Sequence, residues 1–444
     1  MALAAGCFGP KISEGFVCSE SQSCPVGQTC DVDGVCRFNA LPPEISSDDD
    51  DDVVVGDTGG GDDHGGGDDH GEGDDHGGGD DPGNDPGNDP GNDTGGGDTD
   101  DKVCEAWDAL HFDPCSLPSP SGALTIGQNL TIDTDAPGFI GDPASNPAFP
   151  ANAVVNGNLV IVVESFRLTS GNNLRVMGSR PLVIASFSTI EVDGVIDVAS
   201  YSVPQSLGAG ADGFSCEQAP TGFGGTSSDP RGGGGGGAFR GTGGRGGSFV
   251  GDRALAGTAS SRPGNPRGGC AGGDGGTKGD ADGGSGGSGG GGVQLSALKS
   301  VSVSGRISAG GAGGAGTVCV VGDCGGAGGG GSGGYIGIDA SSISVSESAV
   351  LAANGGAGGS GTTSVSSSTG EAGSDGLNSS SSAAGAHNGG DGSSRTFRDG
   401  RNGLPQSLGN GSGGGGGGAG WILFNGSANV ASGATVSPNW LPSN

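Results

Sequence analysis

A six-residue repeat contains the side chains best suited to hold a metal ion. The unit DDHGxG occurs three times, and its acidic and imidazole groups are Asp62, Asp63, His64, Asp68, Asp69, His70, Asp74, Asp75 and His76. Such groups ligate Zn²⁺ and Ca²⁺. An EF-hand loop, however, needs alternating D-x-D-x-D-G spacing and a bidentate Glu, and these copies also lack an apolar residue that could anchor the ligands. We therefore expect no dedicated cofactor and only weak Ca²⁺ binding.

The same stretch is the most acidic part of the chain. From Asp48 to Asp101 there are twenty Asp, one Glu and no Lys or Arg, within a total net charge of −32. Repulsion between like charges and the high conformational entropy of Gly oppose a packed structure. We expect residues 41–102 to be a disordered linker. The acidity also repels nucleic acid and anionic lipid headgroups, so no nucleic-acid partner is expected.

Three carboxylates in one short segment could support acid–base chemistry. Glu191, Asp193 and Asp197 lie close together, and clustered carboxylates cleave glycosidic bonds in carbohydrate-active enzymes. Alternation would place Glu191 and Asp193 on a face opposite Ile190 and Val192, where a solvated strand surface is the simpler interpretation. No His lies at catalytic spacing from a partner, so the sequence predicts a protein that is not an enzyme.

Arginines make one glycine-rich stretch locally basic: they are Arg231, Arg240, Arg245, Arg253, Arg262 and Arg267. They could pair with the acidic linker or with an anionic polysaccharide, or they could simply keep the stretch soluble.

Ten of the eleven cysteines fall into plausible near pairs, which is typical of an oxidising compartment. Cys18, Cys24, Cys30 and Cys36 recur every six residues, which predicts a small disulfide module over residues 8–40. Zinc is the rival, although its usual CxxC spacing is missing. The other candidates for disulfide bonds are Cys104 with Cys115, Cys216 with Cys270, and Cys319 with Cys324.

The eleventh cysteine, Cys7, follows small residues in "LAAGC", which is similar to the cleavage site of a lipoprotein signal. We expect Cys7 to carry lipid and residues 1–7 to be the remnant of a signal whose apolar part lies upstream. No run of about 18 apolar residues occurs, so no transmembrane helix is expected.

The remaining chain, residues 103–444, repeats a pattern of short alternating strands. "PLVIASFSTIEVDGVIDVAS" has regularly spaced apolar residues, called the apolar marks here, at Ile184, Ile190, Val192, Ile196 and Val198. Four further copies carry the corresponding marks: Val160, Phe166, Leu168, Leu174 and Val176; Leu295, Val301, Val303, Ile307 and Ala309; Ile336, Ile338, Ile343, Val345 and Val350; and Ile422, Phe424, Val430 and Val436. Units of this size must stack to bury their apolar side chains. The pattern predicts an all-β, parallel β-helix-like solenoid, with an antiparallel β-sandwich as the alternative.

Long insertions separate these copies at residues 208–292, 310–334 and 355–420, and Gly accounts for 107 of the 444 residues. They could be flexible surface loops. Alternatively, runs such as "GGAGGAG" could pack as bundled helices of polyproline II type, where only Gly permits close approach.

The order of these parts resembles glycine-rich predicted surface lipoproteins of myxobacterial type. The resemblance rests on the lipobox-like Cys7, the cysteine unit, the Asp/Gly stretch, "FDPC" and "GSRPLVIASFSTIEVDGVIDV". It implies a place on the extracellular face of the outer membrane, or secretion, but no activity and no site residues. We expect a non-enzymatic protein that serves adhesion or envelope structure. A polysaccharide-binding or polysaccharide-degrading β-helix is the alternative. The expected partners are outer-membrane lipid through the anchor, extracellular polysaccharide and other surface proteins.

Overall fold

The computed structural model describes residues 28–30, 36–38, 104, 107–140, 146–217, 221–248, 251–320, 322–362, 369–406 and 411–442. The chain divides into two compact units, Met1–Gly91 and Asn92–Asn444. In the first unit, β1 (Gln28–Cys30) and β2 (Cys36–Phe38) pair antiparallel. The second unit contains the other described elements.

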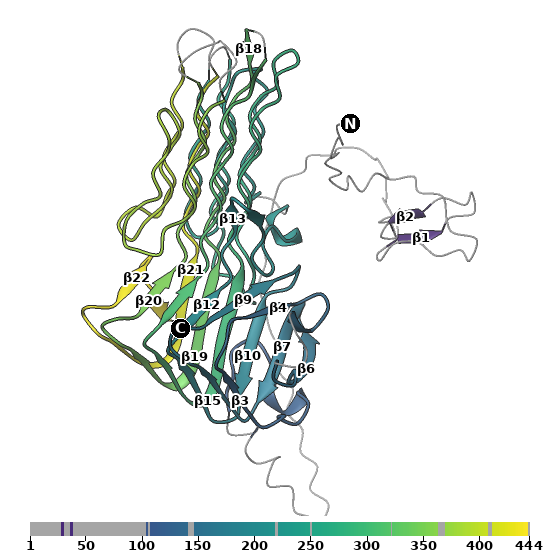
Figure 1. The fold of residues 1–444 in the computed structure, drawn as a ribbon, viewed down its shortest axis with the longest axis vertical. Helices are drawn as coiled ribbons and strands as arrows, with labels where there is room; N and C mark the ends of the chain where they lie inside the picture. The colour runs from purple at the N-terminus through teal and green to yellow at the C-terminus, as the bar shows by residue number, and fades with distance from the viewer. Residues whose placement is uncertain are drawn as a thin grey trace, which may run out of the picture. The chain divides into compact units, whose positions relative to one another are not determined.

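The regular secondary structure of the second unit is almost entirely β-strand, and most of the strands belong to two larger sheets (Figure 1). The first sheet comprises β3 (Ala123–Ile126), β6 (Ala151–Val155), β7 (Asn158–Val163), β8 (Ser165–Leu168), β10 (Leu182–Ser186), β11 (Thr189–Val192), β15 (Gly292–Val303), β19 (Tyr335–Val345), β21 (Trp421–Val430) and β23 (Leu441–Pro442). The second sheet comprises β4 (Leu130–Asp133), β5 (Gly138–Ile140), β9 (Asn173–Met177), β12 (Val195–Asp197), β16 (Arg306–Ser308), β20 (Val350–Ala352) and β22 (Thr435–Ser437).

The remaining elements are short. They are the hairpins β13 (Tyr201–Ser202) with β14 (Gln205–Ser206) and β17 (Cys319–Val320) with β18 (Asp323–Cys324), and the 3-10 turns η1 (Pro114–Ser116) and η2 (Phe214–Cys216). In the described part of the chain, no helix has the length and apolarity that crossing a membrane would require.

Successive units pair side by side in parallel and in register. In the first sheet, Ile190 lies opposite Phe166 on one neighbouring strand and Val301 on the other. In the second sheet, Ile196 lies opposite Leu174 and Ile307. Within these two sheets, the described antiparallel pairs are β5 with β4 and β6 with β7. The repeated strands thus differ from the antiparallel pairing that a β-sandwich would require.

The apolar marks of the repeat form one continuous core between the two sheets. Two of the predicted marks are wrong by one residue. Val160 faces away from this core, and Leu159 and Ile161 point into it instead. Val350 is half-buried, whereas its neighbour Leu351 is fully buried.

A sixth unit, which the sequence analysis did not identify, precedes the other five. Strands β3 and β4 contribute Leu124, Ile126, Leu130 and Ile132 to the same core. Their strands pair in parallel with β8 and β9 of the next unit. The repeat therefore begins earlier than its five recognised copies.

The loop closed by the disulfide Cys104–Cys115 covers the outer face of the first sheet. Its Trp107 and Phe112 are buried against Val160, Val183 and neighbouring apolar side chains, so residues on both faces of β7 and β10 are buried.

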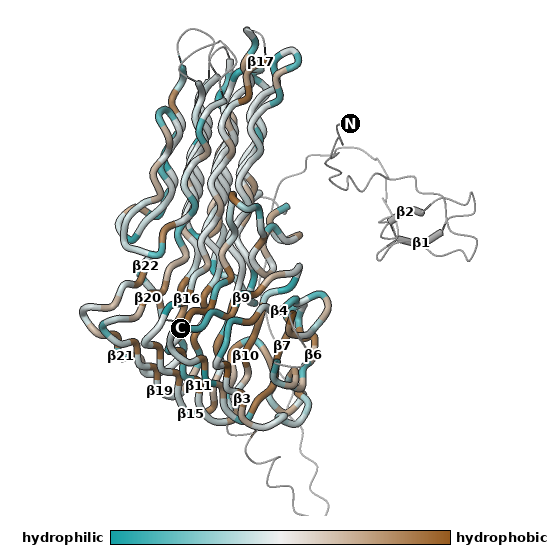
Figure 2. Tube along the Cα trace, viewed as in Figure 1, coloured by the Kyte–Doolittle hydropathy of each residue, from teal (hydrophilic) through white to brown (hydrophobic). Residues whose placement is uncertain are grey.

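The three glycine-rich insertions extend away from the sheets as long segments that run side by side (Figure 1). Hydrophobic residues are concentrated in the sheets, while the hydropathy of the extended segments is mostly near neutral (Figure 2).

Candidate functional site

The hydrogen bonds of residues 325–334, called the central segment here, repeat every three residues. Its backbone N–H groups donate to three neighbouring segments in turn. The first neighbour accepts at Gly276, Gly273 and Cys270, from Gly326, Gly329 and Ser332. The second accepts at Ser412, Gly415 and Gly418, from Ala327, Gly330 and Gly333, and the third accepts at Ala315, Ala312 and Ala309, from Gly328, Gly331 and Gly334. Each of the three turns thus bonds the same three neighbours. A period of three with no internal hydrogen bonds is that of the polyproline II helix.

The carbonyls of the central segment bind three further neighbours. They accept from Gly284, Gly287 and Gly290, from Gly234 and Gly237, and from Gly356 and Gly359. The central segment is therefore surrounded by six others. The insertions form a hydrogen-bonded bundle of polyproline II-like segments rather than flexible loops. We call the segments with these bonds the glycine bundle.

Close backbone approach explains why these segments consist of Gly. A Cβ atom added to Gly329 would lie 2.0 Å from the carbonyl oxygen of Gly235. One added to Gly417 would lie 1.9 Å from the carbonyl oxygen of Gly331. Any side chain at such a position would push a neighbouring segment away and break its hydrogen bonds.

Two disulfides tie the glycine bundle together. Cys216–Cys270 joins two parts of the first insertion, and Cys319–Cys324 closes the hairpin of β17 and β18 in the second. The expected pairs among the described cysteines are thus all bonded. Cys7, Cys18 and Cys24 lie outside the described residues, and for Cys30 and Cys36 only the backbone is described.

Three carboxylates accept hydrogen bonds from backbone N–H groups of the glycine segments. Asp274 accepts from the backbone N–H of Gly286 at 2.8 Å, and Asp375 accepts from that of Gly313 at 2.9 Å. Asp212 accepts from Gly289 at 2.9 Å. Burial raises the pKa of Asp212 from 3.8 to about 6, against the opposing effect of its hydrogen bonds.

Three adjacent segments, residues 240–247, 253–262 and 395–403, form one side of the bundle, and all of them carry arginines. Residues 241–247 bond residues 254–257 through Gly243 to Gly257 and Gly246 to Ala254, both at 3.2 Å. On the other side they accept from residues 400–403, at 2.9 and 2.8 Å. The seven arginines of this arginine face are Arg240, Arg245, Arg253, Arg262, Arg395, Arg398 and Arg401.

Most of these arginines bond neutral groups. Arg395 donates to the side-chain oxygen of Asn439 at 3.0 Å, and Arg240 donates to the carbonyl of the same residue. Burial, and secondly the charge of Arg398, lowers the pKa of Arg240. Among the described residues, the one ion pair of the face joins Arg401 and Asp391 at 3.7 Å.

The two remaining predicted arginines lie elsewhere. Arg267 stacks on the ring of Phe239 at 4.0 Å and donates to the hydroxyl of Ser260 at 2.9 Å. Its burial lowers its pKa to about 10. Arg231 forms an ion pair with Asp323 at 3.5 Å. Both therefore hold parts of the bundle together.

The three carboxylates singled out in the sequence pair with two different arginines. Arg167 lies 3.3 Å from both Glu191 and Asp193, and all three side chains are partly exposed. Asp197 is buried instead, and it pairs with Arg175 at 3.2 Å.

Asp197 is held further by Tyr201, whose hydroxyl donates to its carboxylate at 3.1 Å. Burial and the charge of Asp197 raise the pKa of Tyr201 to about 12. Asp197 thus lies in a structural network with Arg175 and Tyr201, separate from the ion pairs of Glu191 and Asp193.

The histidines of the described region have local partners. His111 bonds the side chain of Gln294 at 2.8 Å, and burial lowers its pKa, so it stays neutral at pH 7. His387 lies 3.9 Å from Glu371 with both side chains exposed. Within the described ranges, no three acidic, His or Cys side chains could together hold a metal ion. The DDHGxG repeat lies outside those ranges.

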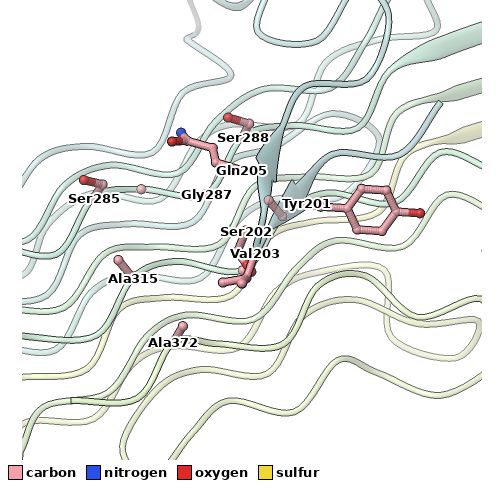
Figure 3. A pocket seen from close by; sticks show the side chains of 12 residues that line it. Tyr201, Ser202, Val203, Gln205, Ser285, Gly287, Ser288, Ala315 and Ala372 are labelled. Atoms are coloured by element: carbon pink, nitrogen blue, oxygen red, sulfur yellow. The ribbon is translucent and has the colours of Figure 1, made fainter. Parts of the chain in front are cut away.

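A hollow of about 230 Å³ lies between the hairpin of β13 and β14 and the glycine bundle (Figure 3). Ser285, Ser288, Ala315 and Ala372 line its bundle side, and the ring of Tyr201 points away from them. Hydroxyl, methyl and backbone groups thus form most of its wall.

No family model, no curated protein and no solved structure matches the chain.

Proposed function

We propose that this chain is a non-enzymatic cell-surface protein that serves adhesion or cell-envelope structure. In this proposal the two sheets form a solenoid of β-helix type, lipid on Cys7 anchors the chain at the extracellular face of the outer membrane, and the acidic stretch acts as a spacer.

The glycine bundle is the observation that carries the proposal. Its segments are ordered by backbone hydrogen bonds, with two disulfides as additional ties. A segment such as residues 325–334 spans about 31 Å at roughly 3.1 Å per residue. Ordering so much Gly is costly in conformational entropy. A rigid surface that presents side chains to a binding partner requires such ordered segments. Disulfides are typical of an extracellular protein.

Adhesion of the native cells tests the proposal. We expect cells without the gene to adhere less or to become sensitive to detergent, and the intact gene to restore both properties. A gene that encodes the Cys7→Ala variant should yield protein that is released into the medium. It should restore neither adhesion nor resistance to detergent. Mass spectrometry should find lipid on the peptide that begins at Cys7 in the intact protein. Unchanged adhesion and envelope integrity in cells without the gene would refute the proposal.

A further inference from the structure

We propose that the arginine face binds an anionic polysaccharide whose charged groups are carboxylates. This inference deepens the proposed function and rests on it in one respect, since the face must be exposed outside the cell. It is carried by charge, geometry and the type of side chain at the face.

Charge is the first argument. Seven arginines lie on the three adjacent segments, whereas the carboxylates near them are only Asp252, Asp391 and Asp399. Asp399 is engaged by the backbone N–H of Thr242 at 2.8 Å, and Asp391 by Arg401. The face is therefore a positive area on a chain with a net charge of −32. Such a local excess attracts an anionic partner.

Geometry is the second argument. The arginines come from three neighbouring segments. Along one of them, the separation of Arg253 from Arg262 corresponds to about 28 Å at roughly 3.1 Å per residue. Arg398 and Arg401 are one turn apart, about 9 Å. Charges spread along a strip of this length suit an extended polymer better than a single small anion.

Side-chain type is the third argument. The face uses only arginine, and neither of the two lysines in the described part of the chain, Lys278 and Lys299, lies on it. The planar guanidinium can grip a carboxylate with two parallel hydrogen bonds. Apolar side chains lie among the arginines: Leu255 is 64% exposed, Leu404 is 56% exposed, and Phe397 is 54% exposed beneath Arg401. Sugar rings present C–H groups that can pack on such surfaces.

The acidity of the rest of the chain favours a polymer with widely spaced charges. Double-stranded DNA carries one charge per roughly 1.7 Å of its axis, so a protein with a large negative net charge repels it strongly. A carboxylated polysaccharide carries its charges farther apart and loses less to that repulsion.

Binding of the purified full-length protein to alginate and polygalacturonate tests the inference, with neutral dextran and double-stranded DNA as comparison polymers. The variant carries Arg245→Gln and Arg398→Gln, whose side chains are exposed. The matched control carries Lys299→Gln and Arg306→Gln, which are exposed on the sheets and remove the same charge.

We expect both acidic polysaccharides to bind and neutral dextran not to bind. The arginine variant should bind them about tenfold more weakly, because it loses two exposed ion pairs. The control should bind within about twofold of the intact protein. Raising the salt concentration should weaken binding less in the arginine variant than in the intact protein.

Equal binding by the arginine variant and the control would overturn the inference, as would tighter binding to DNA or equal binding to dextran. Failure of the proposed function is distinguishable. If the purified protein binds the polysaccharides but cells adhere equally well without the gene, the ligand inference stands and the adhesion proposal fails.

Discussion

Replacing Gly329 by Ala is expected to destabilise the glycine bundle by about 3 kcal/mol. The new Cβ would lie 2.0 Å from the carbonyl oxygen of Gly235, and real Cβ contacts are essentially never closer than 3.0 Å. The central segment and its neighbour must therefore separate by about 1 Å or more.

That separation affects four backbone hydrogen bonds of 2.8–2.9 Å. Gly234 to Ala327 and Gly237 to Gly330 join the two segments directly, and Gly329 to Gly273 and Gly273 to Gly235 hold the two residues that would clash. Each contributes about 1 kcal/mol net. The lower entropy of the unfolded chain with Ala offsets roughly 0.4–1 kcal/mol of this loss.

Denaturant unfolding together with hydrogen exchange checks the prediction. The Gly329→Ala protein should lose amide protection in residues 325–334 while β7 and β10 keep theirs. Gly264→Ala is the matched control, because a Cβ there has nothing within 4 Å, and its unfolding free energy should change by no more than about 1 kcal/mol. Equal stability and equal protection in the two variants would refute the close-approach argument.

Three further predictions concern the disulfide, a buried acid and a surface ion pair. Replacing Cys216 and Cys270 by Ser should cost up to about 4 kcal/mol of unfolding free energy, because the bond closes a separation of 54 residues; calorimetry that finds no loss would contradict this. The pKa of Asp212 is raised from 3.8 to about 6, so the folded state binds more protons in that range. Stability should therefore fall as pH rises from 4 to 7, by at most roughly 3 kcal/mol, and Asp212→Asn should flatten this trend in denaturant titrations. Arg167→Ala should cost less than about 1 kcal/mol, since its partners are partly exposed, and a loss above about 2 kcal/mol in the same titrations would show that the pair matters more than its exposure indicates.

The repeated strands were largely predictable because alternation of apolar residues is a local signal. Ile184, Ile190 and Ile196 all lie in the core as the pattern predicts. The assignment failed for Val160 because β7 is apolar on both faces: the loop with Trp107 covers its outer side. A run of apolar residues without alternation cannot indicate which face meets which partner.

The arginine face could not be predicted as a unit. Arg245 and Arg398 are far apart in the sequence, and they share a face only because their glycine segments are neighbours. Because glycine triplets are alike, the neighbours of each segment cannot be predicted from the sequence pattern. The run "GGAGGAG" indicated polyproline II packing as one alternative, but it did not distinguish a bundle from a flexible loop.

The three-residue turn of the glycine bundle restricts how its sequence can change in length. Inserting one residue into the central segment would rotate every later N–H by about a third of a turn and direct it at the wrong neighbour. It would also bring residues such as Ser332 into positions that only Gly fits. Insertion of a whole triplet preserves the phase but lengthens one segment by about 9 Å, so its bonded neighbours must lengthen too. Within the bundle, changes in length should therefore occur in threes and in several segments together, whereas the turns between segments can vary one residue at a time.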